Sequence, residues 1–279
     1  MNKTLEFKNP SLIDRIKGML SVDFYRLFHT PLFYIFLGIA AIIPALVSMG
    51  MSTTDPTTGQ ITGSSLENIW IMVAVEKPLY VVNNIAEYAN MNMVFIFGGI
   101  MVSIFIGHDY KSGYVKQLFT THAKKQDYMI SKSLTCAFAM ASMCLTYLLG
   151  TIVSGIVNQI SFSVNVGSLI IAILGKMVMS LGWASLYTFL NVIFRRYFGV
   201  SIASSFFFGT GILIIGVGAI IDSLSLNSSI LNLFLYGSSV NACLSSNILT
   251  LLTCIGVSLL WAIIYNLVGT YILNRSDVY

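Results

Sequence analysis

Long stretches without a charged residue limit how this chain can fold. Residues 89–107 and 134–153 contain no Asp, Glu, Lys or Arg. Each stretch has about the length that an α-helix needs to cross a hydrocarbon layer of roughly 30 Å. Hydrophobic residues make up 56% of the chain and charged residues only 9%, a balance that a soluble domain rarely shows. The sequence therefore predicts an integral membrane protein.

Six segments meet the same criterion, and we expect each to form a transmembrane helix in one domain that covers residues 1–279. Membrane β-barrel strands are shorter and alternate apolar with polar residues, which these segments do not. The predicted fold class is therefore an all-α integral membrane protein. The six predicted transmembrane helices cover residues 31–51, 89–107, 134–153, 168–193, 200–221 and 247–273.

The distribution of Lys and Arg predicts the orientation, because cytoplasmic loops retain positive charge during insertion. Basic residues gather before the first predicted span, in the loop 108–133, in the link that holds Arg195 and Arg196, and in the tail. On the opposite side, Lys77 is the only basic residue in the loops. We therefore predict that both termini are cytoplasmic.

An amphipathic helix is expected before the first span. Ser11 is a suitable N-cap, and apolar residues recur at helical spacing across residues 11–30 while charged residues occupy other faces. Such a helix lies along the membrane surface as an elbow. On the outer side, residues 52–88 open as a turn-rich loop and continue as an amphipathic or re-entrant segment. Residues 222–246 are expected to form a second element that dips into the membrane.

Motifs for catalysis and metal binding are absent from the sequence. There is no GxSxG, HExxH or P-loop motif, and no metal-ligand cluster follows from the three histidines. We therefore predict no catalytic residue, no metal and no ATPase site, so any ATP must be bound by another chain.

Three polar residues inside the apolar segments are candidates for a translocation path. Lys176 is expected near the outer interface, where it either snorkels to the head groups or lines the mouth of a path. Asn191 and Asn266 either line a path or bridge neighbouring helices.

The cytoplasmic loop carries a pattern of residues that resembles a known family. It reads Asp-Tyr-Lys-Ser-Gly-Tyr-Val-Lys-Gln-Leu over residues 109–118, followed by Lys124, Tyr128 and Ser131-Lys132. This pattern is similar to the cytoplasmic loop of ABC-2 type ABC transporter permeases. The elbow helix and the six spans with both ends inside fit the same family. The residues that the resemblance assigns to ATPase coupling are Asp109, Tyr110, Ser112, Gly113, Val115, Lys116, Leu118 and Phe119.

In that family, the helix after the second span docks on a separate ATPase subunit. Read as a helix from Ser112, the loop places Val115, Leu118 and Phe119 on one face as an apolar ridge for the partner, and Asp109 and Ser112 are placed to cap its start. Residues 124–132 are expected to anchor the third span at the inner leaflet. For the helix that begins at Ser112, the alternative to docking on an ATPase is an amphipathic helix at the inner leaflet, where its lysines contact anionic lipid.

The resemblance implies the permease subunit of an ATP-driven exporter in the bacterial plasma membrane. Its expected partners are ABC ATPase subunits that bind ATP and Mg²⁺, a second permease subunit in a homodimer, and membrane lipids, with no nucleic acid. Amphipathic peptides such as bacteriocins or cytolytic toxins are the expected cargo. Two alternatives stay open, namely an ATP-independent carrier or channel, and a membrane sensor or scaffold that transports nothing.

Overall fold

The computed structural model describes residues 11–51, 53–54, 61–62, 85–121, 123–157, 166–224, 228–244 and 248–275. These residues are almost entirely helical, as the all-α prediction requires. Among the described residues, four helices are long and apolar enough to cross a membrane, and the number rises to six if each of two bent helix pairs is one span. This part of the chain is therefore compatible with a multi-pass helical membrane protein that has four to six spans.

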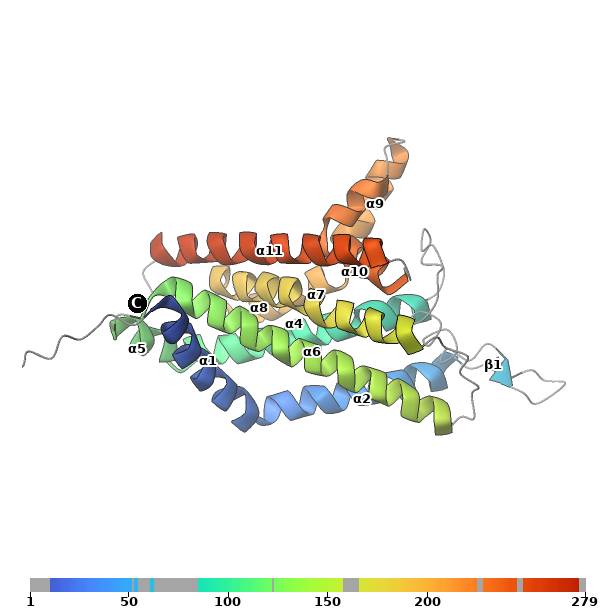
Figure 1. Ribbon diagram of the computed structural model, residues 1–279, viewed down its shortest axis with the longest axis horizontal. Coiled ribbons are helices and arrows are strands. Elements are labelled where there is room, and N and C mark those ends of the chain that lie inside the picture. Colours follow the sequence, from blue (N-terminus) through green and yellow to red (C-terminus); the bar gives the residue numbers. More distant parts are fainter. Residues whose placement is uncertain are drawn as a thin grey trace, which may run out of the picture.

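The longest helices lie side by side along the long axis of the molecule (Figure 1). They are α4 (Ile85–Lys111), α6 (Lys125–Val157), α7 (Val166–Ile193) and α11 (Ile248–Arg275). Helix α7 packs against both α6 and α11, and its Trp183 stacks on Phe95 of α4 with ring centroids 5.2 Å apart. This aromatic pair lies in the main hydrophobic core, where both side chains are buried.

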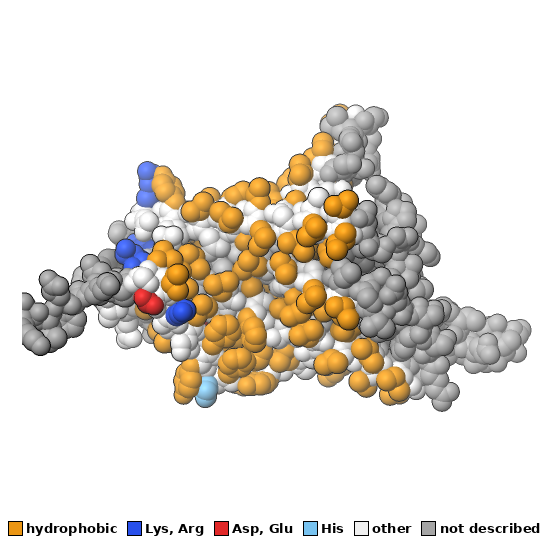
Figure 2. Space-filling view, in the orientation of Figure 1, with side chains coloured by type: hydrophobic (Ala, Val, Ile, Leu, Met, Phe, Trp, Pro, Cys, Tyr) orange, Lys and Arg blue, Asp and Glu red, His pale blue; other side chains and the backbone are white. Residues whose placement is uncertain are grey.

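The surface of the bundle is apolar along most of its length. Figure 2 shows hydrophobic side chains along the middle of the visible face, whereas the Lys, Arg, Asp and Glu side chains gather at the end that holds α5 and the last turn of α11. We call this the basic end. Leu260 and Leu267 of α11, for example, are 55% and 62% exposed. Such an uncovered apolar surface suits contact with lipid rather than water.

Helices α1 (Leu12–His29) and α2 (Pro31–Met51) form the predicted elbow and the span that follows it. The backbone N–H of Asp14 donates to the Ser11 hydroxyl, which confirms Ser11 as the N-cap. The axes of α1 and α2 differ by 65°. Pro31 begins α2, as expected of a residue that has no backbone N–H to lose in a first turn. Helix α1 packs against α6.

The predicted span 200–221 is wrong as a single straight helix. The structure has α8 (Phe198–Gly209) and α9 (Ile212–Ser223), with a bend of 50° between them. Gly211 lies at the bend with φ +69°, and a Cβ atom there would lie 1.9 Å from the Tyr236 ring. A left-handed residue cannot continue a right-handed helix, so α8 ends here. Figure 1 shows α9 projecting away from the bundle.

The predicted loop 108–133 is mostly helical. Helix α4 continues to Lys111 and α6 begins at Lys125, so the second and third helices extend beyond their predicted boundaries at 107 and 134. Between them lies the short helix α5 (Tyr114–Thr120). The hydropathy criterion stopped at the first charged residue, whereas these helices continue because their buried charges pair with one another, as described below.

Two outer segments are partly described. Strands β1 (Thr53–Thr54) and β2 (Ile61–Thr62) pair antiparallel within the predicted turn-rich loop. The amphipathic or re-entrant segment predicted before α4 lies largely within residues 63–84, outside the described residues. Between α9 and α11 stand a 3₁₀ helix, η1 (Ser228–Leu233), and α10 (Leu235–Leu244). Helix α10 packs against α7 and α11.

Candidate functional site

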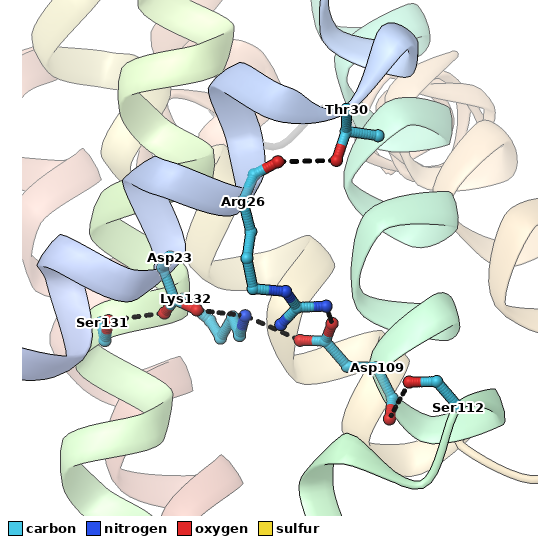
Figure 3. Close-up of polar contacts among 7 residues, drawn as sticks. All are labelled: Asp23, Arg26, Thr30, Asp109, Ser112, Ser131 and Lys132. Atoms are coloured by element: carbon cyan, nitrogen blue, oxygen red, sulfur yellow. Dashed lines mark hydrogen bonds and ion pairs between the residues drawn. The ribbon is translucent and has the colours of Figure 1, made fainter.

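Four charged side chains from three helices meet inside the basic end of the bundle (Figure 3). Asp23 and Arg26 come from α1, Asp109 from the end of α4, and Lys132 from α6. The Lys132 Nζ atom lies 2.6 Å from Asp23 Oδ1 and 2.6 Å from Asp109 Oδ2. The Arg26 guanidinium donates to Asp109 Oδ1. We call these four residues the charge cluster.

The charge cluster is internally balanced, and three of its four residues are buried, whereas the Arg26 side chain is 24% exposed. Lys132 and Asp109 are 0% exposed and Asp23 is 2% exposed. Two carboxylates face two cations, so the cluster carries no net charge. Ser131 adds a further hydrogen bond, its hydroxyl donating to Asp23 Oδ2 at 2.6 Å. Buried charges are stable only when paired and hydrogen-bonded in this way, which ties the three helices to one arrangement.

Two aromatic rings extend the charge cluster to α5. The Phe105 ring of α4 lies 4.8 Å from Lys132 Nζ and 5.8 Å from Arg26 Cζ. Tyr114, the first residue of α5, lies with its ring centroid 4.2 Å from Arg26 Cζ. Stacking of a guanidinium on an aromatic face is attractive. The start of α5 is therefore linked directly to α1.

A second ion pair holds the other end of α1. Arg15 Nε donates to Asp127 Oδ2 at 2.7 Å, and the Asp127 side chain is only 2% exposed. Asp127 lies in the first turn of α6, where a carboxylate also interacts favourably with the helix dipole. With Asp23 and Lys132, this pair attaches α1 to α6 at two positions.

The apolar ridge of α5 packs against the bundle. Val115 is 1% exposed and packs in a cluster with Met129, Val192 and Leu273. The Phe119 ring lies edge-on to Tyr128 with centroids 5.6 Å apart, and Leu118 is also partly buried there. Val115 is buried, whereas Leu118 and Phe119 are only partly buried. The docking of this ridge in a partner cleft stays a prediction.

The predicted caps of the coupling helix are wrong. The N-cap of α5 is Gly113 at φ 75°, with no side-chain hydrogen bond to the helix. The Asp109 carboxylate is engaged with Arg26 and Lys132, and the Ser112 hydroxyl donates to the Asp109 carbonyl at 3.4 Å. Glycine suits this left-handed position between two helices.

The remaining coupling residues divide between the two faces of α5 and its flanks. Tyr110 is partly buried and packs against both the main core and the cluster around Val115. The exposed positions are Lys111, Ser112, Lys116, Gln117 and Thr120. These polar residues form one surface at the basic end, which we call the α5 polar face.

Residues 124–132, which are predicted to anchor the third span at the inner leaflet, carry two cations that contact other helices. Lys132 is fully buried in the charge cluster. Lys125 is partly buried, and its Nζ donates to the Leu273 carbonyl near the end of α11 at 2.6 Å. Only Lys124 is an exposed cation in this segment. The segment is the first part of α6, and its charges connect that helix to α1, α4 and α11.

Asn191 and Asn266 both bridge helices. Asn191 is 2% exposed, its Nδ2 donates to Ser103 of α4 at 3.1 Å, and its Oδ1 accepts from Ser201 of α8. Asn266 of α11 accepts from Ser133 of α6 at 3.0 Å and donates to Ser185 of α7 at 3.1 Å. These contacts match the helix-bridging alternative.

Lys176 lies far from the charge cluster. It is a partly exposed residue of α7, and Val192, which packs against α5, follows it by 16 positions. At 1.5 Å per residue this places the two about 24 Å apart along the helix. Its role in a translocation path stays a prediction.

The sequence contained an unused signal for the charge cluster. Ile16, Leu20, Asp23 and Leu27 follow one another at steps of four, three and four residues. This spacing puts Asp23 on the apolar face of α1, where an unpaired carboxylate is costly. This pattern therefore predicts a buried cation on a neighbouring helix, but it does not predict which residue supplies that cation.

The site can join helices mechanically, because it links α5 to α1, α4 and α6 through paired charges and stacked rings. It shows no arrangement of a nucleophile and a base among the residues named above. The chain matches no protein-family model and no curated protein sequence.

Proposed function

We propose that this chain is the membrane-spanning permease subunit of an ATP-driven exporter of the ABC-2 type. The observation that carries the proposal is the link from α5 to the charge cluster. Tyr114 at the start of α5 stacks on Arg26, which pairs with Asp109, which in turn pairs with Lys132 of α6. A force applied to α5 from outside the membrane thus reaches α1 and the long helix α6.

Mechanical coupling of this kind requires helices that move together. Removing one partner from a buried ion pair costs about 3–5 kcal/mol, so motions that separate α1 from α6 are strongly disfavoured. Helix α6 continues for 33 residues from the basic end. A tilt imposed on its first turns is therefore carried to the opposite end of the bundle. ATP binding and hydrolysis in the partner would supply that force.

The α5 polar face is the proposed contact with the ATPase subunit. It presents Lys111, Ser112, Lys116, Gln117 and Thr120 beside a helix whose apolar residues pack against the bundle. Cations and amides at an exposed helix fit a polar or acidic cleft, where complementary charge orients the two partners. ATP and Mg²⁺ are held by that subunit. A second copy of this chain completes a homodimer in the bacterial plasma membrane.

Co-purification tests the ATPase contact. The full chain extracted from its native membrane is expected to bring down a subunit with Walker motifs. Lys116→Glu combined with Gln117→Glu should abolish that association, because both changes place negative charge on the α5 polar face. Lys17→Glu, at an exposed position of α1, is the matched control and should retain the subunit.

Other outcomes would replace the proposal. Transport by liposomes that contain this chain alone would identify an ATP-independent carrier or channel. Recovery of a different protein, whose binding is lost with the α5 variants, would identify a sensor or scaffold.

The proposed cargo is an amphipathic peptide of the bacteriocin or cytolytic toxin type. Cells that express the chain with its ATPase should survive a panel of membrane-active peptides better than cells that lack it. Equal survival across the panel would contradict this cargo class while leaving the ATPase contact unaffected.

A further inference from the structure

A groove of about 380 Å³ opens between α6 and α11 and reaches α7 at Leu181. Apolar side chains from two antiparallel helices form its walls, with Ile130 and Leu134 on α6 and Leu259, Ile263 and Leu267 on α11. Ile263 and Leu267 are 61% and 62% exposed. The groove is therefore a feature of the outer surface and is separate from the charge cluster.

Three polar residues in the middle of the groove, Ser133, Asn266 and Thr270, are already hydrogen-bonded within the protein. The Ser133 hydroxyl donates to Asn266 Oδ1 at 3.0 Å, and Asn266 Nδ2 donates to Ser185 at 3.1 Å and to the Ala262 carbonyl at 2.8 Å. The Thr270 hydroxyl donates to the Asn266 carbonyl at 2.7 Å. With these donors occupied, the walls offer mainly hydrocarbon contacts, which suits an aliphatic chain.

One end of the groove is basic. Leu267, Tyr271 and Arg275 follow one another at four-residue spacing along the same side of α11. The Arg275 guanidinium lies 4.5 Å from the Tyr271 ring centroid. Across the groove, Lys125 precedes the lining residue Gln126 and joins α6 to the last turns of α11 through the Leu273 carbonyl. Tyr, Lys and Arg at such positions are typical of the membrane interface.

We infer that this groove binds one acyl chain of an anionic phospholipid, with the phosphate held at Lys125 and Arg275. The charge at the basic end selects a lipid with net negative charge, because basic residues between membrane helices attract anionic head groups. The apolar walls of the groove bind the acyl chain of the lipid whatever its head group. Binding requires no ATPase subunit, so this inference stands apart from the proposed function.

Native mass spectrometry of the full chain in detergent tests the lipid site, with dioleoyl phosphatidylglycerol and dioleoyl phosphatidylcholine as probes. The wild-type chain is expected to retain phosphatidylglycerol in preference to phosphatidylcholine. Lys125→Gln with Arg275→Gln should lower the affinity for phosphatidylglycerol about fivefold for each cation removed. The affinity for phosphatidylcholine should not change. Lys17→Gln with Lys111→Gln removes two exposed cations elsewhere and should preserve the preference.

A second pair of variants tests the groove itself. Ile263→Trp fills the groove from an exposed position and should reduce binding of both lipids. Leu260→Trp, 55% exposed on the same helix and outside the groove, should not. Circular dichroism checks that both variants are folded. Equal retention of the two lipids by the wild type, or unchanged retention in Ile263→Trp, would overturn the inference. Loss of a dimer peak in Ile263→Trp alone would instead identify a second copy of the chain as the occupant.

Discussion

Lys132 of α6 and Asp23 of α1 form an ion pair with an Nζ–Oδ1 distance of 2.6 Å, and neither side chain is more than 3% exposed. The two residues are 109 positions apart in the chain. Their contact attaches the elbow helix to the helix that follows the proposed coupling segment. It also makes each residue dependent on the other, because an unpaired buried charge is far less stable than a paired one.

This dependence predicts how substitutions at the pair combine. Asp23→Asn or Lys132→Met alone should lower the free energy of unfolding by about 3–5 kcal/mol, since each leaves an uncompensated buried charge. Lys132→Met leaves one excess negative charge in the charge cluster, whereas Asp23→Asn leaves one excess positive charge. Thermal unfolding in detergent, followed by circular dichroism, measures the effect. The double variant should lose less than the sum of the single losses, and strictly additive losses would show that the pair is not coupled.

Helix α5 should separate from the bundle when its buried face is made polar. Val115→Asp places a carboxylate in the cluster formed with Met129, Val192 and Leu273. Faster hydrogen exchange in residues 114–120 is the expected result, because the apolar contacts hold this short helix. Lys116→Asp changes an exposed neighbour and should leave the exchange rates almost unchanged. Similar exchange in the two variants would contradict the inward placement of Val115.

The bend between α8 and α9 should be sensitive to any side chain at Gly211. A Cβ atom would lie 1.9 Å from the Tyr236 ring, and the left-handed backbone adds strain of roughly 1–2 kcal/mol for an L-residue. We expect Gly211→Ala to lower the unfolding temperature clearly. Gly216→Ala in α9 meets nothing within 4 Å and is the control. An unfolding temperature equal to that of the control would show that neither the left-handed backbone at Gly211 nor its close approach to Tyr236 requires a glycine.

Close packing of α2 on α6 should depend on Gly150. A Cβ atom at this position would lie 2.2 Å from the Ala41 carbonyl oxygen, so the two backbones touch. Gly150→Ala should cost about 1–3 kcal/mol of stability, as overpacking typically does. Gly38→Ala in α2 has open space and should be neutral or slightly stabilising. If Gly150→Ala is as stable as Gly38→Ala, the helices are not in backbone contact.

The helical segments were predictable because their signals are local. Charge-free runs of membrane length, the Ser11 cap and Pro31 each act within a few residues, so the elbow helix and the long apolar helices follow from reading the chain in order. The boundaries at 107 and 134 failed for a physical reason. Asp109 and Lys132 looked too polar to belong to buried helices, and they are buried because each neutralises the other.

The meeting of distant residues depended on how the helices pack. The local sequence does not predict that Asp23 pairs with Lys132, that Val115 packs against Met129, or that Gly211 lies against the Tyr236 ring. These contacts join residues from different helices, and their energies depend on burial and on the partner's position, which neighbouring residues do not specify. Hydropathy alone was sufficient to predict long apolar helices of membrane-spanning length, whereas the charge cluster and the groove between α6 and α11 exist only once α1, α4, α6 and α11 are packed together.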